Sequence, residues 1–165
     1  MLRIGFDLES DGLLDKLTKL HCIGLCDLDN PDAKVVMYDS QSGIEEALRT
    51  LMNATEIMGH NIIAFDIPAI QKVYPWFLPR GTVTDTLVLS RLVCADLKND
   101  DYVSVALPED FKKYMYGSHS LKAWGMRLGQ HKGEIDAGDW SKWTQEMSDY
   151  CAQDVFVTCY LYRYL

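Results

Sequence analysis

Apolar residues recur at two spacings along this chain of 165 residues. In some segments every second residue is apolar, which is typical of strands with one buried face. A turn signal, DNPDA at residues 29–33, separates two such segments and predicts that consecutive strands run antiparallel. The strands predicted in this way cover residues 2–9, 19–28, 34–39, 55–59 and 82–84.

Other segments have apolar residues at every third or fourth position, which predicts helices. Five are predicted, over residues 42–52, 67–73, 86–94, 120–128 and 144–164. Ser40 or Ser42, Asp66 and Asp85 stand where N-caps are expected, and Gly129 follows the fourth helix as a stop signal. Two segments lack either spacing: we expect an irregular surface excursion over 96–117 and a loop over 131–139.

Three strands therefore come first, and single strands then alternate with helices. This order predicts an α/β fold with a mixed sheet of about five strands, three antiparallel and the later ones parallel, flanked by helices. The chain has no repeat, linker or low-complexity tract, so residues 1–165 are expected to form a single domain.

Composition narrows the class of protein. With 48% hydrophobic residues the chain can bury a core, and no apolar run approaches the length of a membrane span. The N-terminus does not resemble a signal peptide, and the five cysteines lack the spacing of a zinc site, so a cytoplasmic protein with reduced thiols is expected. A net charge of −8 disfavours long contacts with a phosphate backbone and leaves two alternatives, an acidic surface or a site that works through bound cations.

Asp7 and Glu9 lie two residues apart in the first strand, within IGFDLES. Successive side chains of a strand alternate between faces, so both carboxylates point the same way, roughly 7 Å apart. They could belong to the polar outer face of an edge strand. On a central strand, two carboxylates are costly unless something neutralises them, which would indicate a site.

Two further segments carry acids in suggestive positions. Asp66 ends GHNIIAFD, where it could simply cap a helix, but the preceding Asn61 and Phe65 could grip a nucleotide by hydrogen bonding and stacking. Tyr150 and Asp154 are four residues apart in DYCAQD and share one face of the last helix. This pair could face solvent, or it could form the wall of a pocket.

The four carboxylates can converge at the carboxyl end of the first strand, where open α/β sheets place their sites. Together they would repel one another unless divalent cations were bound. A donor set made only of oxygen suits Mg²⁺ or Mn²⁺, and two such ions can clamp the attacking and leaving oxygens of a phosphodiester.

FDLES, HNIIAFD and DYCAQD, in this order, resemble the three motifs of the proofreading 3′–5′ exonucleases of the ribonuclease H-like superfamily. The tyrosine four residues before the last acid marks the subclass with four acids and a tyrosine. LLDKLTKLHCIG, DTLVLSRL, GSHSLKAWGMRLG and KGE further resemble the exonuclease domain of the family A DNA polymerases of short-tailed bacteriophages. The resemblance covers essentially the whole chain, although no polymerase motif is present.

The resemblance implies a role for each site residue. Asp7, Glu9 and Asp154 would hold the metal ion that activates water, and Asp7 would bridge to a second ion that Asp66 supports through water. Tyr150 would orient the attacking water. Leu8, Ser10, Asn61 and Phe65 are candidates for gripping the terminal nucleotides.

The expected activity is stepwise removal of deoxynucleoside 5′-monophosphates from the 3′ end of single-stranded or frayed DNA, in the host cytoplasm if a phage encodes the chain. A polymerase domain is a possible partner in the natural chain, and no membrane is expected. Two alternatives remain: an exonuclease that trims RNA or DNA as a free-standing protein, and a non-catalytic domain that binds nucleic acid or a partner.

Overall fold

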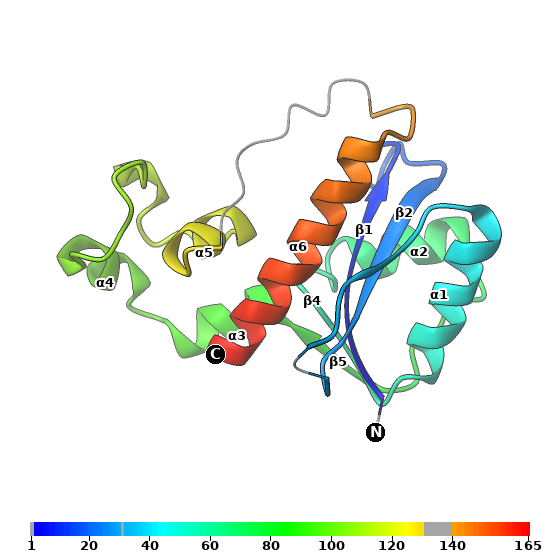
Figure 1. The fold of residues 1–165 in the computed structure, drawn as a ribbon, viewed down its shortest axis with the longest axis horizontal. Helices are drawn as coiled ribbons and strands as arrows, with labels where there is room; N and C mark the ends of the chain where they lie inside the picture. Colours follow the sequence, from blue (N-terminus) through cyan, green and yellow to red (C-terminus); the bar gives the residue numbers. More distant parts are fainter. Residues whose placement is uncertain (1, 31, 131–139) are drawn as a thin grey trace.

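The structure, a computed structural model, describes residues 2–30, 32–130 and 140–165. Its sheet has five strands in the order β3-β2-β1-β4-β5 (Figure 1). β1 and β3 each run antiparallel to β2, whereas β4 is parallel to both β1 and β5. The predicted mixed sheet is therefore confirmed. The strands are Arg3–Ser10 (β1), Leu20–Asp27 (β2), Val36–Tyr38 (β3), Glu56–Gly59 (β4) and Thr82–Asp85 (β5).

The predicted helices are present with small differences at their ends, while the predicted loop at 131–139 lies outside the described residues. Ser40, Asp85, Ser120 and Thr144 cap four of the helices, each accepting a hydrogen bond from a backbone N–H. The helices are Gln41–Asn53 (α1), Asp66–Val73 (α2), Thr86–Val93 (α3), Leu97–Val103 (α4), Leu121–Arg127 (α5) and Gln145–Tyr164 (α6), with a short 3₁₀ turn at Lys113–Met115.

Helices cover the two faces of the sheet. Ile4, Phe6 and Leu8 of β1 are buried in a core cluster with apolar residues of α1 and α2. The alternate residues of β1 face α6, which packs along β1 and β2 on the opposite side (Figure 1). The buried cluster on that side contains Val155 and Cys159 of α6. Asp7 and Glu9 therefore lie on the face that α6 covers.

The segment over 96–117 is more ordered than predicted. It contains α4 and the 3₁₀ turn, and Asp101 in α4 is buried against Arg127 of α5. Arg127 donates two hydrogen bonds to Asp101, at 2.8 and 2.6 Å, and its guanidinium lies over the rings of Phe111 and Trp124. The prediction of an irregular excursion is therefore wrong for α4, because this buried ion pair fixes a polar segment that has little apolar periodicity.

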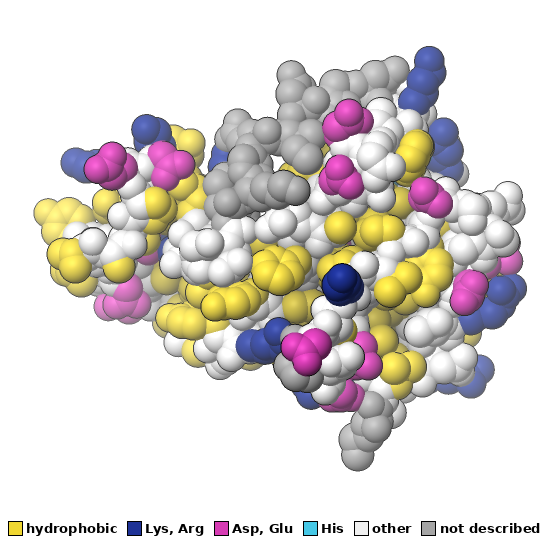
Figure 2. All heavy atoms as spheres, in the orientation of Figure 1, with side chains coloured by type: hydrophobic (Ala, Val, Ile, Leu, Met, Phe, Trp, Pro, Cys, Tyr) yellow, Lys and Arg dark blue, Asp and Glu magenta, His cyan; other side chains and the backbone are white. Residues whose placement is uncertain are grey.

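The surface in the orientation of Figure 1 is mixed. Figure 2 shows hydrophobic side chains spread across the middle of this face, with acidic and basic side chains mostly around its edge. Phe156, Tyr160 and Tyr164 of α6 are among the exposed large apolar residues. Within the described ranges, no helix combines the length and hydropathy needed to cross a bilayer. The assignment of residues 1–165 to a single domain stays a prediction.

Candidate active site

The sheet opens next to the first two acids. β1 pairs with β2 along nearly its whole length, but it pairs with β4 only through Arg3, Ile4 and Gly5. Among the described residues, the second half of β1 therefore has no strand beside it on the β4 side. The register with β2 also shifts between Glu9 and Ser10, as at a β-bulge, and such irregularities commonly redirect side chains beside a site.

Asp66 lies in this opening, at the start of α2. It is the first residue of the helix and not its N-cap; the capping position is Phe65, which makes no side-chain capping bond. The prediction that Asp66 caps the helix is therefore wrong. Its side chain is only 3% exposed and accepts a hydrogen bond from the backbone N–H of Leu8 in β1. The carboxylate thus links the start of α2 to the half of β1 that does not pair with β4.

Helix α6 brings Tyr150 and Asp154 to the same place. The hydroxyl of Tyr150 is hydrogen-bonded to the carboxylate of Asp154 one turn further on. Between them, the Sγ of Cys151 donates to the backbone oxygen of Asp7 at 3.4 Å, which fixes this turn of α6 against β1. The five predicted site residues therefore come together from three distant segments.

The electrostatics of the carboxylates reflect this crowding. Burial raises the pKa of Asp7 well above its ordinary value, and the charges of Asp66, Asp154 and Glu9 raise it further. Burial likewise raises the pKa of Glu9 to about 9, with Cys22, Asp154 and Asp66 adding to the effect. The pKa values of Asp66 and Asp154 both rise to about 7, again chiefly through burial. Ionising all four acids together is therefore unfavourable for the protein alone.

The donor set fits a hard divalent cation. In the described part of the chain, none of the four carboxylates forms an ion pair with Lys, Arg or His. Buried carboxylates without a counter-charge are stabilised by a bound cation, and oxygen donors suit Mg²⁺ or Mn²⁺. As they stand, however, no three His, Cys, Asp or Glu side chains of the described residues are placed to hold an ion together. The chemistry of the donors fits, and their side chains would need to rearrange.

The four residues expected to grip nucleotides lie around these acids in different ways. Leu8 is 4% exposed and its side chain belongs to the core, so its backbone is the part that faces Asp66. Ser10 is buried and its hydroxyl donates to the carbonyl of Gly12. Phe65 is half-buried, and Asn61 is the second residue of the loop after β4. Two of the four, Ser10 and Phe65, line a cavity together with Glu9.

That cavity, of about 420 Å³, opens beside Glu9 and is also lined by three residues that the sequence reasoning missed, Gly12, Leu13 and Trp140. Leu13 is 73% exposed, which is unusual for a large apolar side chain next to buried acids. Trp140 is held by its carbonyl, which accepts a hydrogen bond from Nε2 of His21 at 2.8 Å. A signal for Leu13 was present in the sequence, because it lies only four residues after Glu9, in the loop between β1 and β2. The lining residues are Glu9, Ser10, Gly12, Leu13, Phe65 and Trp140.

Comparison with solved structures defines the class of fold. The exonuclease (EXO) domain of Aedes aegypti Nibbler matches 99% of this chain and 77% of its own, with a TM-score of 0.64 and 17% identity. A zinc-bound complex of Escherichia coli exonuclease I with single-stranded DNA gives a TM-score of 0.58 at 13% identity, over 97% of this chain and 39% of its own. The fold is therefore the ribonuclease H-like fold of exonuclease domains.

Comparison with curated proteins is more specific, although no family model matches the chain. The DNA-directed DNA polymerase of Enterobacteria phage T3 is 33% identical over 187 residues, and that of Escherichia phage T7 is 33% identical over 177 residues. Each match covers 92% of this chain but 25% of the polymerase, so the chain spans about a quarter of the length of these relatives. The chain is thus homologous to part of the phage DNA polymerases, which confirms the resemblance found in its motifs.

Proposed function

We propose that this chain is a metal-dependent 3′–5′ DNA exonuclease that hydrolyses the last phosphodiester of a strand and releases a deoxynucleoside 5′-monophosphate. The observation that carries the proposal is the meeting of Asp7, Glu9, Asp66 and Asp154 with Tyr150, where burial and mutual repulsion raise the pKa values of the acids. Homology to phage DNA polymerases supports DNA as the substrate.

The four acids would hold two divalent cations, Mg²⁺ or Mn²⁺. Bound there, the cations supply Lewis-acid activation of water and neutralise charge on the leaving oxygen. Asp7, Glu9 and Asp154 would hold the cation on the side of the attacking water, and Asp7 and Asp66 the cation on the side of the leaving 3′ oxygen. In the reaction the water oxygen bonds to phosphorus, the bond from phosphorus to the 3′ oxygen breaks, and the 3′ oxygen leaves as a hydroxyl.

Tyr150 would orient the attacking water as a hydrogen-bonding group. Burial raises the pKa of its phenol above the ordinary value, and the charge of Asp154 raises it further. The hydroxyl therefore stays protonated at neutral pH and does not serve as the general base. Its bond to Asp154 places it beside the carboxylate that would hold the cation on the water side.

The cavity beside Glu9 would receive the terminal nucleotide. Phe65, Leu13 and Trp140 offer apolar surfaces against which a base can pack, while Ser10 lies at the end of β1 near the acids. Such contacts recognise any base, which suits an enzyme that removes nucleotides irrespective of sequence.

We further propose that this activity proofreads for a polymerase domain, because the relatives are DNA polymerases of which this chain matches about a quarter. With a net charge of −8, contacts to DNA would be limited to a few nucleotides at a single-stranded or frayed 3′ end. A phage-encoded protein of this kind would act in the cytoplasm of its bacterial host.

The decisive experiment incubates the protein with 5′-labelled single-stranded DNA and Mg²⁺ or Mn²⁺. We expect a ladder that shortens from the 3′ end, lost by more than about 100-fold in Asp7→Asn. Asp149→Asn is the matched control. Asp149 is exposed on α6 beside Tyr150, and its substitution makes the same change of charge.

Each other outcome points to one alternative. A matched RNA strand that is shortened faster than DNA would identify an RNA-trimming enzyme. Absence of shortening with either strand and either metal would favour a non-catalytic binding domain. Shortening that survives in Asp7→Asn would refute the assignment of the site.

A further inference from the structure

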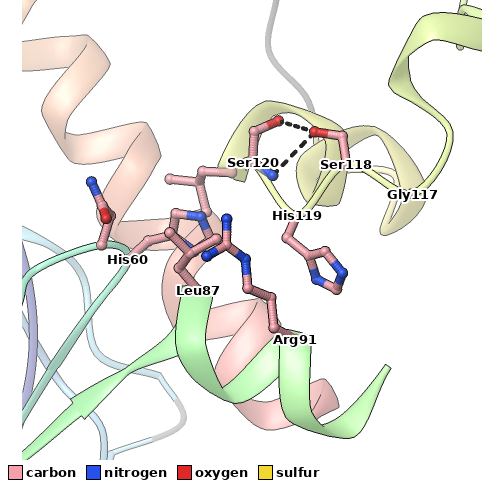
Figure 3. Close-up of a pocket in the computed structure, with 9 residues that line it drawn as sticks. His60, Leu87, Arg91, Gly117, Ser118, His119 and Ser120 are labelled. Carbon is pink, nitrogen blue, oxygen red and sulfur yellow. Dashed lines mark hydrogen bonds between the residues drawn. The ribbon is translucent and has the colours of Figure 1, made fainter. Parts of the chain in front are cut away.

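A second cavity, of about 620 Å³, opens between the carboxyl end of the parallel strands and the start of α5. Figure 3 shows its walls: His60 follows β4, Leu87 and Arg91 rise from α3, and the loop of Ser118 to Ser120 faces them. Asn61 also lines it. None of these residues except Asn61 has a role in the site described above.

Hydrogen bonds hold the first wall of this cavity, the loop after β4, against the start of α3. The carboxylate of Asp85 accepts hydrogen bonds from the backbone N–H groups of Asn61, Ile63 and Leu87 at 2.9, 3.1 and 2.9 Å. Nδ1 of His60 is hydrogen-bonded to the hydroxyl of Thr86 at 2.9 Å. The loop after β4 is thereby fixed against the start of α3, so that wall is preorganised.

The opposite wall is anchored to α3 in the same way. Nδ1 of His119 is hydrogen-bonded to the hydroxyl of Ser90 at 3.0 Å. Ser118 and Ser120 are linked through their hydroxyls at 3.1 Å (Figure 3). Ser118, His119 and Ser120 thus line the cavity as polar residues held in place by these bonds.

The charge of the cavity comes from Arg91. Its side chain is exposed, and it forms no ion pair or hydrogen bond with any described residue in a protein with a net charge of −8. The pKa of His60 is lowered to about 4, mainly by burial, so this ring is neutral at pH 7. The cavity therefore offers one guanidinium surrounded by neutral hydrogen-bonding groups, which suits an anion with one charge, such as a phosphodiester.

Asn61 links this cavity to the acids. It is the only non-glycine residue with a positive φ, 66°, among those described, and it stands five residues before Asp66 in the loop that joins β4 to α2. Backbone strain of this kind persists where the surrounding structure holds it, and the bonds of Asp85 to this loop provide that hold. The loop that carries Asn61 thus runs from the wall of this cavity directly to Asp66.

We propose that this cavity binds one internucleotide phosphate of the single strand, upstream of the bond that is cut, through Arg91 with His119 and Asn61 beside it. The proposal rests on the proposed exonuclease function, since it assigns a subsite for the same substrate. Arg91 acts here in binding and not in the chemical step.

The test measures binding of fluorescent single-stranded DNA of about eight nucleotides by anisotropy, in EDTA so that the strands stay intact. Arg91→Ala should weaken binding about fivefold or more. It should also make the slope of log K against log salt shallower by about 0.7, the value for one phosphate contact on a single strand. Arg80→Ala is the matched control, because Arg80 is exposed beside Gly81 and Thr82 at the opposite end of the sheet.

The position of the contact is tested with modified strands. A methylphosphonate at one upstream linkage should reproduce the loss in the wild type and add nothing in Arg91→Ala. A dinucleotide has only the linkage that is cut, so its KM should be the same in Arg91→Ala and the wild type.

Three results would overturn the proposal: equal losses in Arg80→Ala and Arg91→Ala, no methylphosphonate position that mimics Arg91→Ala, or a changed KM for the dinucleotide. Equal unfolding midpoints of the two variants exclude a folding defect. If the wild type fails to cut DNA but the salt slope still depends on Arg91, the exonuclease proposal fails and the phosphate subsite stands.

Discussion

Replacing Asp66 by asparagine should stabilise the metal-free protein at pH 8 while removing nuclease activity. Asp66 is 3% exposed, and it has acids rather than cations for neighbours. Asparagine has the same shape and keeps a carbonyl oxygen that can accept the hydrogen bond from the N–H of Leu8. The substitution therefore removes a buried charge and leaves the packing nearly unchanged.

The size of the effect follows from the pKa of Asp66, which burial raises from 3.8 to about 7. One pKa unit corresponds to about 1.4 kcal/mol, so ionised Asp66 lowers the stability of the metal-free protein on the order of 4 kcal/mol. For a domain of this size each kcal/mol moves the unfolding midpoint by about 2–4 °C, which gives a rise on the order of 10 °C for Asp66→Asn.

The pH dependence gives the sign of the effect. Because the folded pKa of Asp66 lies above the unfolded one, the folded protein holds the proton more tightly, and this stability is lost as pH rises through the folded pKa. The difference in unfolding free energy between Asp66→Asn and the wild type should therefore be small near pH 4, increase between pH 4 and 7, and become constant above pH 7.

The assay is urea unfolding in EDTA at a series of pH values, repeated with Mg²⁺, with exposed Asp149→Asn as the control. Mg²⁺ should stabilise the wild type more than Asp66→Asn, since a ligand that binds only the folded state adds stability. Lower stability of Asp66→Asn at pH 8 in EDTA, or a difference that does not change with pH, would refute the reasoning.

Three further substitutions test other parts of the structure. Asp101→Asn leaves the buried Arg127 unpaired and should lower the free energy of unfolding in urea by about 3–5 kcal/mol. Glu45→Gln, at an exposed ion pair, should lower it by less than about 1 kcal/mol. Similar losses in the two variants would count against a special contribution from the buried pair. Tyr150→Phe should lower kcat by about 10–100-fold without moving the pH profile, and a shifted basic limb would instead make Tyr150 the base. Gly59→Ala places a methyl group 2.8 Å from the backbone oxygen of Phe6 and should destabilise by about 1–3 kcal/mol, which an unchanged unfolding midpoint would contradict.

The elements that could be predicted from the sequence are those whose pattern is local. The alternation in β1 and the spacing in α6 placed Asp7, Glu9, Tyr150 and Asp154 on the right faces, because side-chain direction follows from the period of a strand or helix. The N-caps at Ser40 and Asp85 could be predicted as well, because a cap depends on the residues next to it in the sequence.

The features that could not be predicted depend on contacts between distant segments. Asp101 and Arg127 are 26 residues apart, and neither looks buried until α4 and α5 are brought together. Asp66 has the sequence context of an N-cap, and only the gap between β1 and β4 turns it toward the acids. Arg91 and His119 look like ordinary surface residues until α3 and the loop before α5 face each other.

The short pairing between β1 and β4 divides β1 into two halves of different mechanical character. The half at Arg3, Ile4 and Gly5 is hydrogen-bonded to strands on both sides and forms the rigid centre of the sheet. The half that carries Asp7 and Glu9 is tied to a strand on one side only. Its acids can therefore shift around an arriving cation or strand without any rearrangement of the sheet. Adjustability at the site is in this way separated from the rigidity on which the fold depends.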